Sequence, residues 1–168
     1  MDADLVGSMG PSEYLKARVE MYMGWYDQKA VKYKSYYLKM RALSVVGGAV
    51  VPVLVNLNIP TPFKDYITTV VSLIVVITVS LESVYHYREQ WKNYRSTEQF
   101  IGAEKFQFLT KEGPYKTLEP TNAFLLLVER VETAIASENA ATLNIMTLAS
   151  EVKERGKAAA SPEEMSSR

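Results

Sequence analysis

Few residues of this chain have types and spacings that favour chemistry, and the first pair lies at the end of a long apolar stretch. His86, the only histidine, follows Glu82 by about one helical turn. An ionisable group at membrane depth is costly and often functional, and histidine titrates near neutral pH. If both side chains instead lie at a membrane boundary, the carboxylate reaches water and needs no special role. Glu82 and His86 are therefore a candidate membrane-depth pH sensor or an ordinary boundary pair.

A second candidate is a row of small side chains with the spacing of one helical face. Steps of three, four, four and three residues join Thr69, Ser72, Val76, Ser80 and Ser83. Such a face suits the lining of a water-filled pore, with a ring of Val76 side chains as a hydrophobic constriction. Alternatively, the hydroxyls bond to carbonyls of their own helix or pack on a neighbouring helix. The polar Thr78 lies on the opposite face.

The remaining polar groups do not form a catalytic pattern. There is no cysteine, so disulfides, thiol chemistry and zinc clusters are excluded, and no phosphate-binding glycine loop is present. Without histidine companions, the carboxylates Glu98, Glu104, Glu129 and Glu132 are typical of salt bridges in a helical bundle. We add Trp25 and Arg95 to these four as candidate assembly contacts. The sequence predicts no enzyme, no cofactor and no metal site, and its zero formal charge predicts no nucleic-acid partner.

The candidate residues of the membrane-depth pair and the pore face lie in or next to two apolar runs. Ala42–Phe63 has no charged residue in 22 positions, and Tyr66–Leu81 has none in 16. A helix rises about 1.5 Å per residue, and the hydrocarbon core of a bilayer is about 30 Å thick. We therefore predict a transmembrane hairpin over 41–87, with spans at about 42–59 and 65–85. The alternative is a buried core hairpin in a soluble helical protein, but the second run is apolar all round.

The distribution of basic residues predicts the orientation. Five of them precede the first span between Lys29 and Arg41, and Arg88, Lys92 and Arg95 follow the second. The connection has only Lys64, balanced by Asp65. By the positive-inside rule, both termini face the cytoplasm of a multi-pass inner-membrane protein, whose basic residues contact anionic lipid. Tyrosines at both ends of the hairpin suit an interfacial belt or, alternatively, an ordinary helix surface: Tyr33, Tyr36, Tyr37, Tyr85 and Tyr87.

Long helices are expected on either side of the hairpin. After a disordered start at 1–10, a cytosolic helix over 11–40, capped by Ser12, has an apolar stripe that includes Val19, Tyr26 and Ala30. That stripe is an oligomer-forming seam or packs on the chain's own helices. A cytosolic helical region over 88–156 follows, and a flexible tail over 157–168 ends the chain. We expect the second span to continue as one helix past His86, up to Gly113-Pro114.

Further details of packing follow from the same periodicity. Ser44, Gly48, Pro52 and Asn56 recur at every fourth position, so this face of the first span is expected to let helices approach closely. Glu98 interrupts an apolar stripe and needs a partner if buried, for which Arg95, Arg18 and Arg130 are candidates. The last helix is expected to bury a face with Glu129, Arg130, Glu132 and Glu138 on its other side. That face is Phe124, Val128, Val131, Ile135, Asn139, Thr142, Met146 and Ala149.

Several short motifs, in order, carry a resemblance to a known family. They are YLKAR and WYDQKA (14–18 and 25–30), WKNYRSTEQF (91–100), EKFQFLT (104–110), GPY (113–115) and FLLLVERVETAIASENA (124–140). Together with the hairpin, they resemble the SLATT family, the SMODS- and SLOG-associating two-transmembrane effector domains of bacterial conflict systems, in a branch long described as of unknown function. The resemblance implies two spans flanked by cytosolic helices and a pore-forming or membrane-perturbing effector.

The sequence thus predicts an all-α membrane protein, with a two-span transmembrane helical hairpin flanked by long cytosolic helices that form a helical bundle. Its expected function is a homo-oligomeric, ion-conducting pore in bacterial defence or stress response, since two spans cannot enclose a water path alone. A separate sensor protein is a possible partner. The alternative function is a non-conducting membrane scaffold that recruits a soluble partner through the cytosolic helices.

Overall fold

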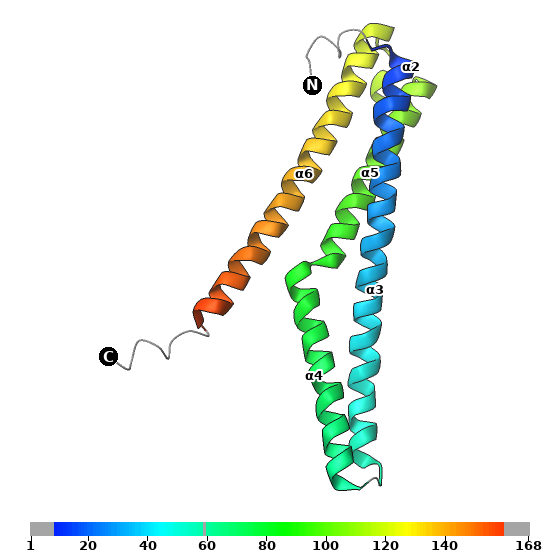
Figure 1. The fold of residues 1–168 in the computed structure, drawn as a ribbon. Coiled ribbons are helices and arrows are strands. Elements are labelled where there is room, and N and C mark those ends of the chain that lie inside the picture. The colour runs from blue at the N-terminus through cyan, green and yellow to red at the C-terminus, as the bar shows by residue number, and fades with distance from the viewer. Residues whose placement is uncertain (1–8, 59, 160–168) are drawn as a thin grey trace, which may run out of the picture. The chain divides into compact units, whose positions relative to one another are not determined.

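The predicted all-α class is confirmed by a computed structural model that describes residues 9–58 and 60–159, in which no strand occurs (Figure 1). Its helices are α2 (Pro11–Tyr14), the π-helix η1 (Leu15–Glu20), α3 (Met21–Asn56), α4 (Thr61–Tyr85), α5 (Tyr87–Thr110), the 3₁₀-helix η2 (Gly113–Tyr115) and α6 (Pro120–Ala159). Most of the predicted start (1–8) and tail (160–168) lies outside the described residues.

The helix boundaries follow from local chemistry, with two corrections to the predictions. Gly10 rather than Ser12 is the N-cap of α2, because Pro11 takes the first helical position, for which its fixed φ is suited. Helix α4 ends at His86, which adopts φ 49° and donates its backbone N–H to Glu82 O at 3.1 Å. The predicted uninterrupted helix across this position is therefore wrong. A left-handed residue cannot continue a right-handed helix.

By their contacts, the residues fall into two units. The bundle unit comprises Met1–Lys32 and Gln90–Leu143, and the apolar unit comprises Tyr33–Glu89 and Asn144–Arg168. The core of the bundle unit is made by side chains from α2, η1, α3, α5, η2 and α6, among which Val19, Tyr26, Ile101, Leu127 and Val131 are fully buried. These residues recur at helical spacing, so each helix buries one stripe.

The buried face of α6 matches the predicted one at Val131 and Ile135 and is shifted by one residue on either side of them. Ala123, Leu127, Val131, Ile135 and Glu138 are buried, whereas the expected core position Asn139 is exposed. The prediction placed every charge of α6 outside, but Glu138 is buried and accepts a hydrogen bond from the Thr142 hydroxyl at 2.6 Å. The side chains of Met146 and Ala149 lie outside the described part of the chain.

Candidate functional site

The apolar unit carries an extensive exposed hydrophobic surface. Two helical stretches, Pro11–Asn56 and Thr61–Tyr115, are long and apolar enough to cross a membrane. In their most apolar 18-residue windows, 0% and 6% of the residues are buried within the chain. Val46, Val53, Phe63, Leu73 and Val76 all expose more than half of their surface. A soluble core hairpin would bury these side chains, so this chain alone does not provide the environment they need.

The second half of α3 lies against α4 (Figure 1), and the contact uses a different row from the predicted one. A Cβ atom on Gly47 would lie 2.5 Å from Val75 Cγ2, whereas Gly48 has nothing within 4 Å. In the second half of α3 the half-buried positions are Ser44, Gly47, Val51 and Leu54, while the predicted Gly48, Pro52 and Asn56 are exposed. Both the predicted and the observed row begin at Ser44. The observed row then advances by three, four and three residues, which follows the period of about 3.6 residues per turn more closely than the predicted steps of four residues do.

The five predicted lining residues are at one face of α4, and four of them are exposed. Thr69, Val76, Ser80 and Ser83 are exposed, Ser72 is half-buried, and the opposite Thr78 is buried at 4% exposure. The Thr69 hydroxyl donates to Asp65 O and the Ser80 hydroxyl to Val76 O, each at 2.8 Å. These bonds satisfy the donors within the helix, as the alternative interpretation expects, and leave oxygen lone pairs available to water.

Glu82 and His86 do not form an ion pair in the described structure. Both side chains are half-buried, and His86 Nδ1 lies 3.0 Å from Val84 O. The interaction between the two residues is the backbone hydrogen bond that ends α4. The position therefore acts in the structure as a helix terminus, a role that its sequence did not indicate.

Tyrosine rings gather where α3, α4 and α5 meet in the apolar unit. Tyr33 and Tyr36 lie with their ring centroids 6.0 and 5.6 Å from that of Tyr87, which stacks on Tyr85 at 5.5 Å. Aromatic rings with a polar tip suit the boundary between an apolar and an aqueous phase. Their packing against one another also fits the alternative of an ordinary helix surface.

In the bundle unit, Arg18 binds Glu132 through two hydrogen bonds. Arg18 Nε and Nη2 donate to the two carboxylate oxygens at 2.8 and 2.7 Å, and the Tyr14 hydroxyl donates to Glu132 Oε1 at 3.1 Å. The Arg18 bonds lower the pKa of Glu132 and outweigh the effect of its burial. Burial, reinforced by Glu132, raises the pKa of Tyr14. This network joins α2 and η1 to α6.

A more deeply buried network joins α5, η2 and α6. Glu104, at 3% exposure, accepts hydrogen bonds from Arg130 Nε and Nη2, both at 2.7 Å, and from the Tyr115 hydroxyl at 2.6 Å. Burial opposes ionisation of Glu104, but the hydrogen bonds from Arg130 and Tyr115 lower its pKa overall. The carboxylate is therefore held as an anion at neutral pH.

The third network is more exposed. Arg95 Nη1 lies 2.9 Å from both Glu98 Oε2 and Asp27 Oδ1. Of the three candidate partners for Glu98, Arg95 is the one that binds it, because the other two arginines bind Glu132 and Glu104. Trp25 is partly exposed and contacts Tyr94 edge to face, with ring centroids 5.9 Å apart. The structure pairs Glu98, Glu104 and Glu132 with arginines, and among the described residues it shows no ion pair for Glu129. The proposed role of these carboxylates in assembly stays a prediction.

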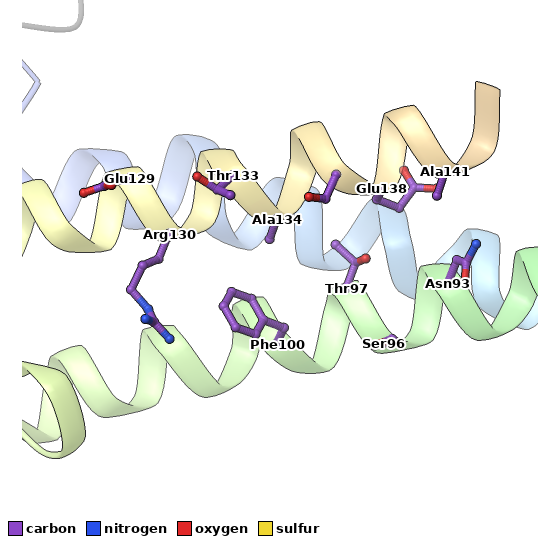
Figure 2. A pocket seen from close by; sticks show the side chains of 11 residues that line it. Asn93, Ser96, Thr97, Phe100, Glu129, Arg130, Thr133, Ala134, Glu138 and Ala141 are labelled. Carbon is purple, nitrogen blue, oxygen red and sulfur yellow. The ribbon is translucent and has the colours of Figure 1, made fainter. Parts of the chain in front are cut away.

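A groove of about 650 Å³ lies between α5 and α6 of the bundle unit. Figure 2 shows Thr97 and Phe100 of α5 facing Arg130 and Ala134 of α6 across it. Its lining includes the exposed Glu129 and the buried Glu138. Sequence reasoning placed Glu138 on the solvent side and missed this groove. The signal that could have found it is the set of small residues that face each other from the two helices, including Ser96, Ala134, Ser137 and Ala141.

Glu138 differs from the other buried carboxylates in its surroundings. It accepts a hydrogen bond from the Thr142 hydroxyl at 2.6 Å, and the buried Tyr26 hydroxyl lies beside it without a hydrogen bond of standard geometry. Burial, with a contribution from Glu138, raises the pKa of Tyr26. No ion pair involves Glu138 in the part of the chain that the structure describes. Within the same part, no three metal-ligating side chains gather.

Over the described residues, these features define an all-helical protein with two helices long and apolar enough to cross a membrane and with a bundle unit tied by arginine–glutamate pairs. The chain belongs to the family described as a protein of unknown function (DUF4231), whose model matches residues 21–123. That match covers α3, α4, α5 and η2 and ends at the start of α6. No curated protein and no solved structure matches the chain.

Proposed function

We propose that this chain is a multi-pass membrane protein that forms an ion-conducting pore as a homo-oligomer. The observation that carries the proposal is the exposed apolar surface of α4 and of the second half of α3, since at most 6% of the residues in the most apolar stretches are buried. Transfer of such a surface from water to lipid is favourable at about 25 cal/mol per Å². Lipid, together with further copies, is therefore the environment that this surface fits.

The pore itself is supported by the composition of the α4 face. The exposed residues Thr69, Ser80 and Ser83 present hydroxyl oxygens, and Val76 between them, 61% exposed, would form the hydrophobic constriction. Two helices per chain cannot surround water, so several copies must share an axis. Ions are the proposed permeant species, and no enzymatic step is required.

The basic residues that flank the two spans support an orientation with both termini in the cytoplasm and anionic lipid at the inner face. The resemblance to the SLATT family supports an inner-membrane effector in bacterial defence or stress response. Membership of a family of unknown function is compatible with that resemblance. In this proposal the trigger is supplied by a separate sensor protein that acts on the bundle unit.

One observation favours a second function, a non-conducting membrane scaffold. The hydroxyls of Thr69 and Ser80 are satisfied by their own helix, so this face of α4 can contact lipid without a water path. In that case the bundle unit would recruit a soluble partner, and α3 and α4 would serve as the anchor alone.

Ion flux from liposomes that contain the purified full-length protein separates the two functions. The test variant is Val76→Ser, and the matched control is Val70→Ser, an exposed valine on α4 about 120° away around the helix. We expect Val76→Ser to raise leak several-fold and Val70→Ser to behave like the wild type. Absence of flux in all three proteins would favour the scaffold. Release of the protein by carbonate wash would contradict both functions.

A further inference from the structure

The groove between α5 and α6 has the properties of a ligand site that the pore does not use. Its volume of about 650 Å³ lies in the range of small-molecule sites. Hydroxyl and amide groups from both helices line it, and the ring of Phe100, together with Ala134 and Ala141, adds an apolar side (Figure 2). The site therefore offers both polar anchors and a surface for an apolar body.

The buried carboxylate of Glu138 gives the groove its charge preference. Glu138 is 4% exposed, accepts a hydrogen bond from the Thr142 hydroxyl and has the neutral Tyr26 hydroxyl beside it, but it has no ion pair in the described part of the chain. Glu98, Glu104 and Glu132, which share the bundle unit with it, each bind an arginine. A desolvated carboxylate without a cation is unfavourable, so binding of a cation to Glu138 removes a cost that the free protein carries.

Arg130, the basic residue that lines the groove, does not pair with Glu138. Arg130 binds both oxygens of Glu104 at 2.7 Å and lies over the Phe100 ring, with its guanidinium carbon 5.6 Å from the ring centroid. Its charge is therefore already matched. Glu129, the other acidic lining residue, is exposed to water and needs no partner.

We propose that the groove binds a small organic cation, a primary ammonium or guanidinium attached to a short apolar body. The charged group pairs with Glu138, accepting groups such as the Ser137 hydroxyl take its remaining N–H donors, and the apolar body packs on Phe100 and Ala141. An organic cation fits better than a divalent metal, because no three metal-ligating side chains gather in the described residues. This inference does not depend on whether the protein conducts ions.

Thermal unfolding of the full-length protein in detergent, followed by tryptophan fluorescence, tests the proposal with butylammonium chloride as the probe. Sodium chloride at equal ionic strength and neutral 1-butanol are the solution controls. We expect a saturable rise of the melting temperature with butylammonium alone, because a ligand that binds the folded state stabilises it. The variant Glu138→Gln should weaken this response at least about tenfold and should melt higher than the wild type without ligand, since the unpaired charge is gone.

Two further variants keep the test decisive. Glu129→Gln, a carboxylate change in the same groove, should respond like the wild type. Ser137→Leu should block binding by filling the groove while Glu138 stays in place, which covers the case in which Glu138→Gln fails to fold. Equal responses to butylammonium and sodium, or equal responses of wild type and Ser137→Leu, would overturn the proposal. A change in copy number in Glu138→Gln would also overturn it, because Glu138 would then pair with a basic side chain of a second copy.

Discussion

Replacement of Arg130 by methionine should destabilise the bundle unit far more than replacement of any exposed cation. Arg130 supplies two hydrogen bonds of 2.7 Å to Glu104, which is 3% exposed and keeps only the Tyr115 hydroxyl at 2.6 Å after the change. Removal of one partner of a buried pair costs about 3–5 kcal/mol. The Arg130 side chain is 39% exposed, so water can partly take its place beside Glu104 in the variant. We therefore expect the free energy of unfolding to fall by about 3 kcal/mol, at the low end of that range.

The assay is thermal unfolding of the full-length protein in detergent, followed by tryptophan fluorescence from Trp25 and Trp91, which both lie in the bundle unit. For a unit of this size, about 3 kcal/mol corresponds to a fall in melting temperature of roughly 12 °C or more. The matched control is Arg95→Met. Arg95 is similarly exposed at 34%, but its partners Asp27 and Glu98 are 51% and 19% exposed, against 3% for Glu104, so the expected loss is about 1 kcal/mol or less.

A double variant tests the cause of the loss. If the cost of Arg130→Met comes from an unpaired buried carboxylate, Glu104→Gln in the same chain should recover about 1–3 kcal/mol of it. Equal melting temperatures for Arg130→Met and Arg95→Met would refute the reasoning. Strict additivity of Glu104→Gln and Arg130→Met would refute it as well.

Three further predictions concern other parts of the structure. The pKa of Glu132 is lowered mainly by its hydrogen bonds from Arg18, so the stability that this pair contributes should be complete above about pH 4.3 and be lost as the pH falls through the lowered pKa. In urea unfolding across this range, the free energy of unfolding of Glu132→Gln should vary less with pH than that of the wild type, and equal pH dependence in the two proteins would contradict the assignment. Gly47→Ala should lower the melting temperature by the equivalent of about 1–2 kcal/mol through its contact with α4, whereas Gly48→Ala, with open space around it, should not. His86→Gly should stabilise the protein by about 1 kcal/mol in the same assay, because glycine adopts the left-handed conformation without cost; an unchanged or lower melting temperature would argue against this conformation.

The sequence predicts the helices well where a single residue type dictates a boundary. Pro11, Pro60 and Gly113 lie at or next to helix ends. The first charge-free run forms the second half of α3, and the second forms most of α4. The break at His86 was not predictable, because histidine is neither a helix breaker nor a strong left-handed residue. No local pattern in the sequence encodes the left-handed conformation of His86.

The candidate sites were predictable only in part, for a related reason. Composition identifies Glu98, Glu104 and Glu132 as carboxylates of a bundle, but it does not assign Arg18 to one and Arg130 to another, since pairing depends on which helices become neighbours. Glu138 was placed on the wrong side because a charge on an apolar stripe is normally exposed. The row of α3 that contacts α4 was predicted to include Gly48, but it includes Gly47, because two adjacent glycines give no sequence signal for which of them faces the neighbouring helix.

The proposed pore requires several copies of this chain to share an axis in the membrane, with α4 toward that axis. Electron cryomicroscopy of the full-length protein in lipid nanodiscs tests it most directly. The account predicts a ring of copies in which Thr69, Val76 and Ser80 face a central path through the bilayer. A single copy, or an assembly whose centre is filled by lipid or packed side chains in every state, would contradict it.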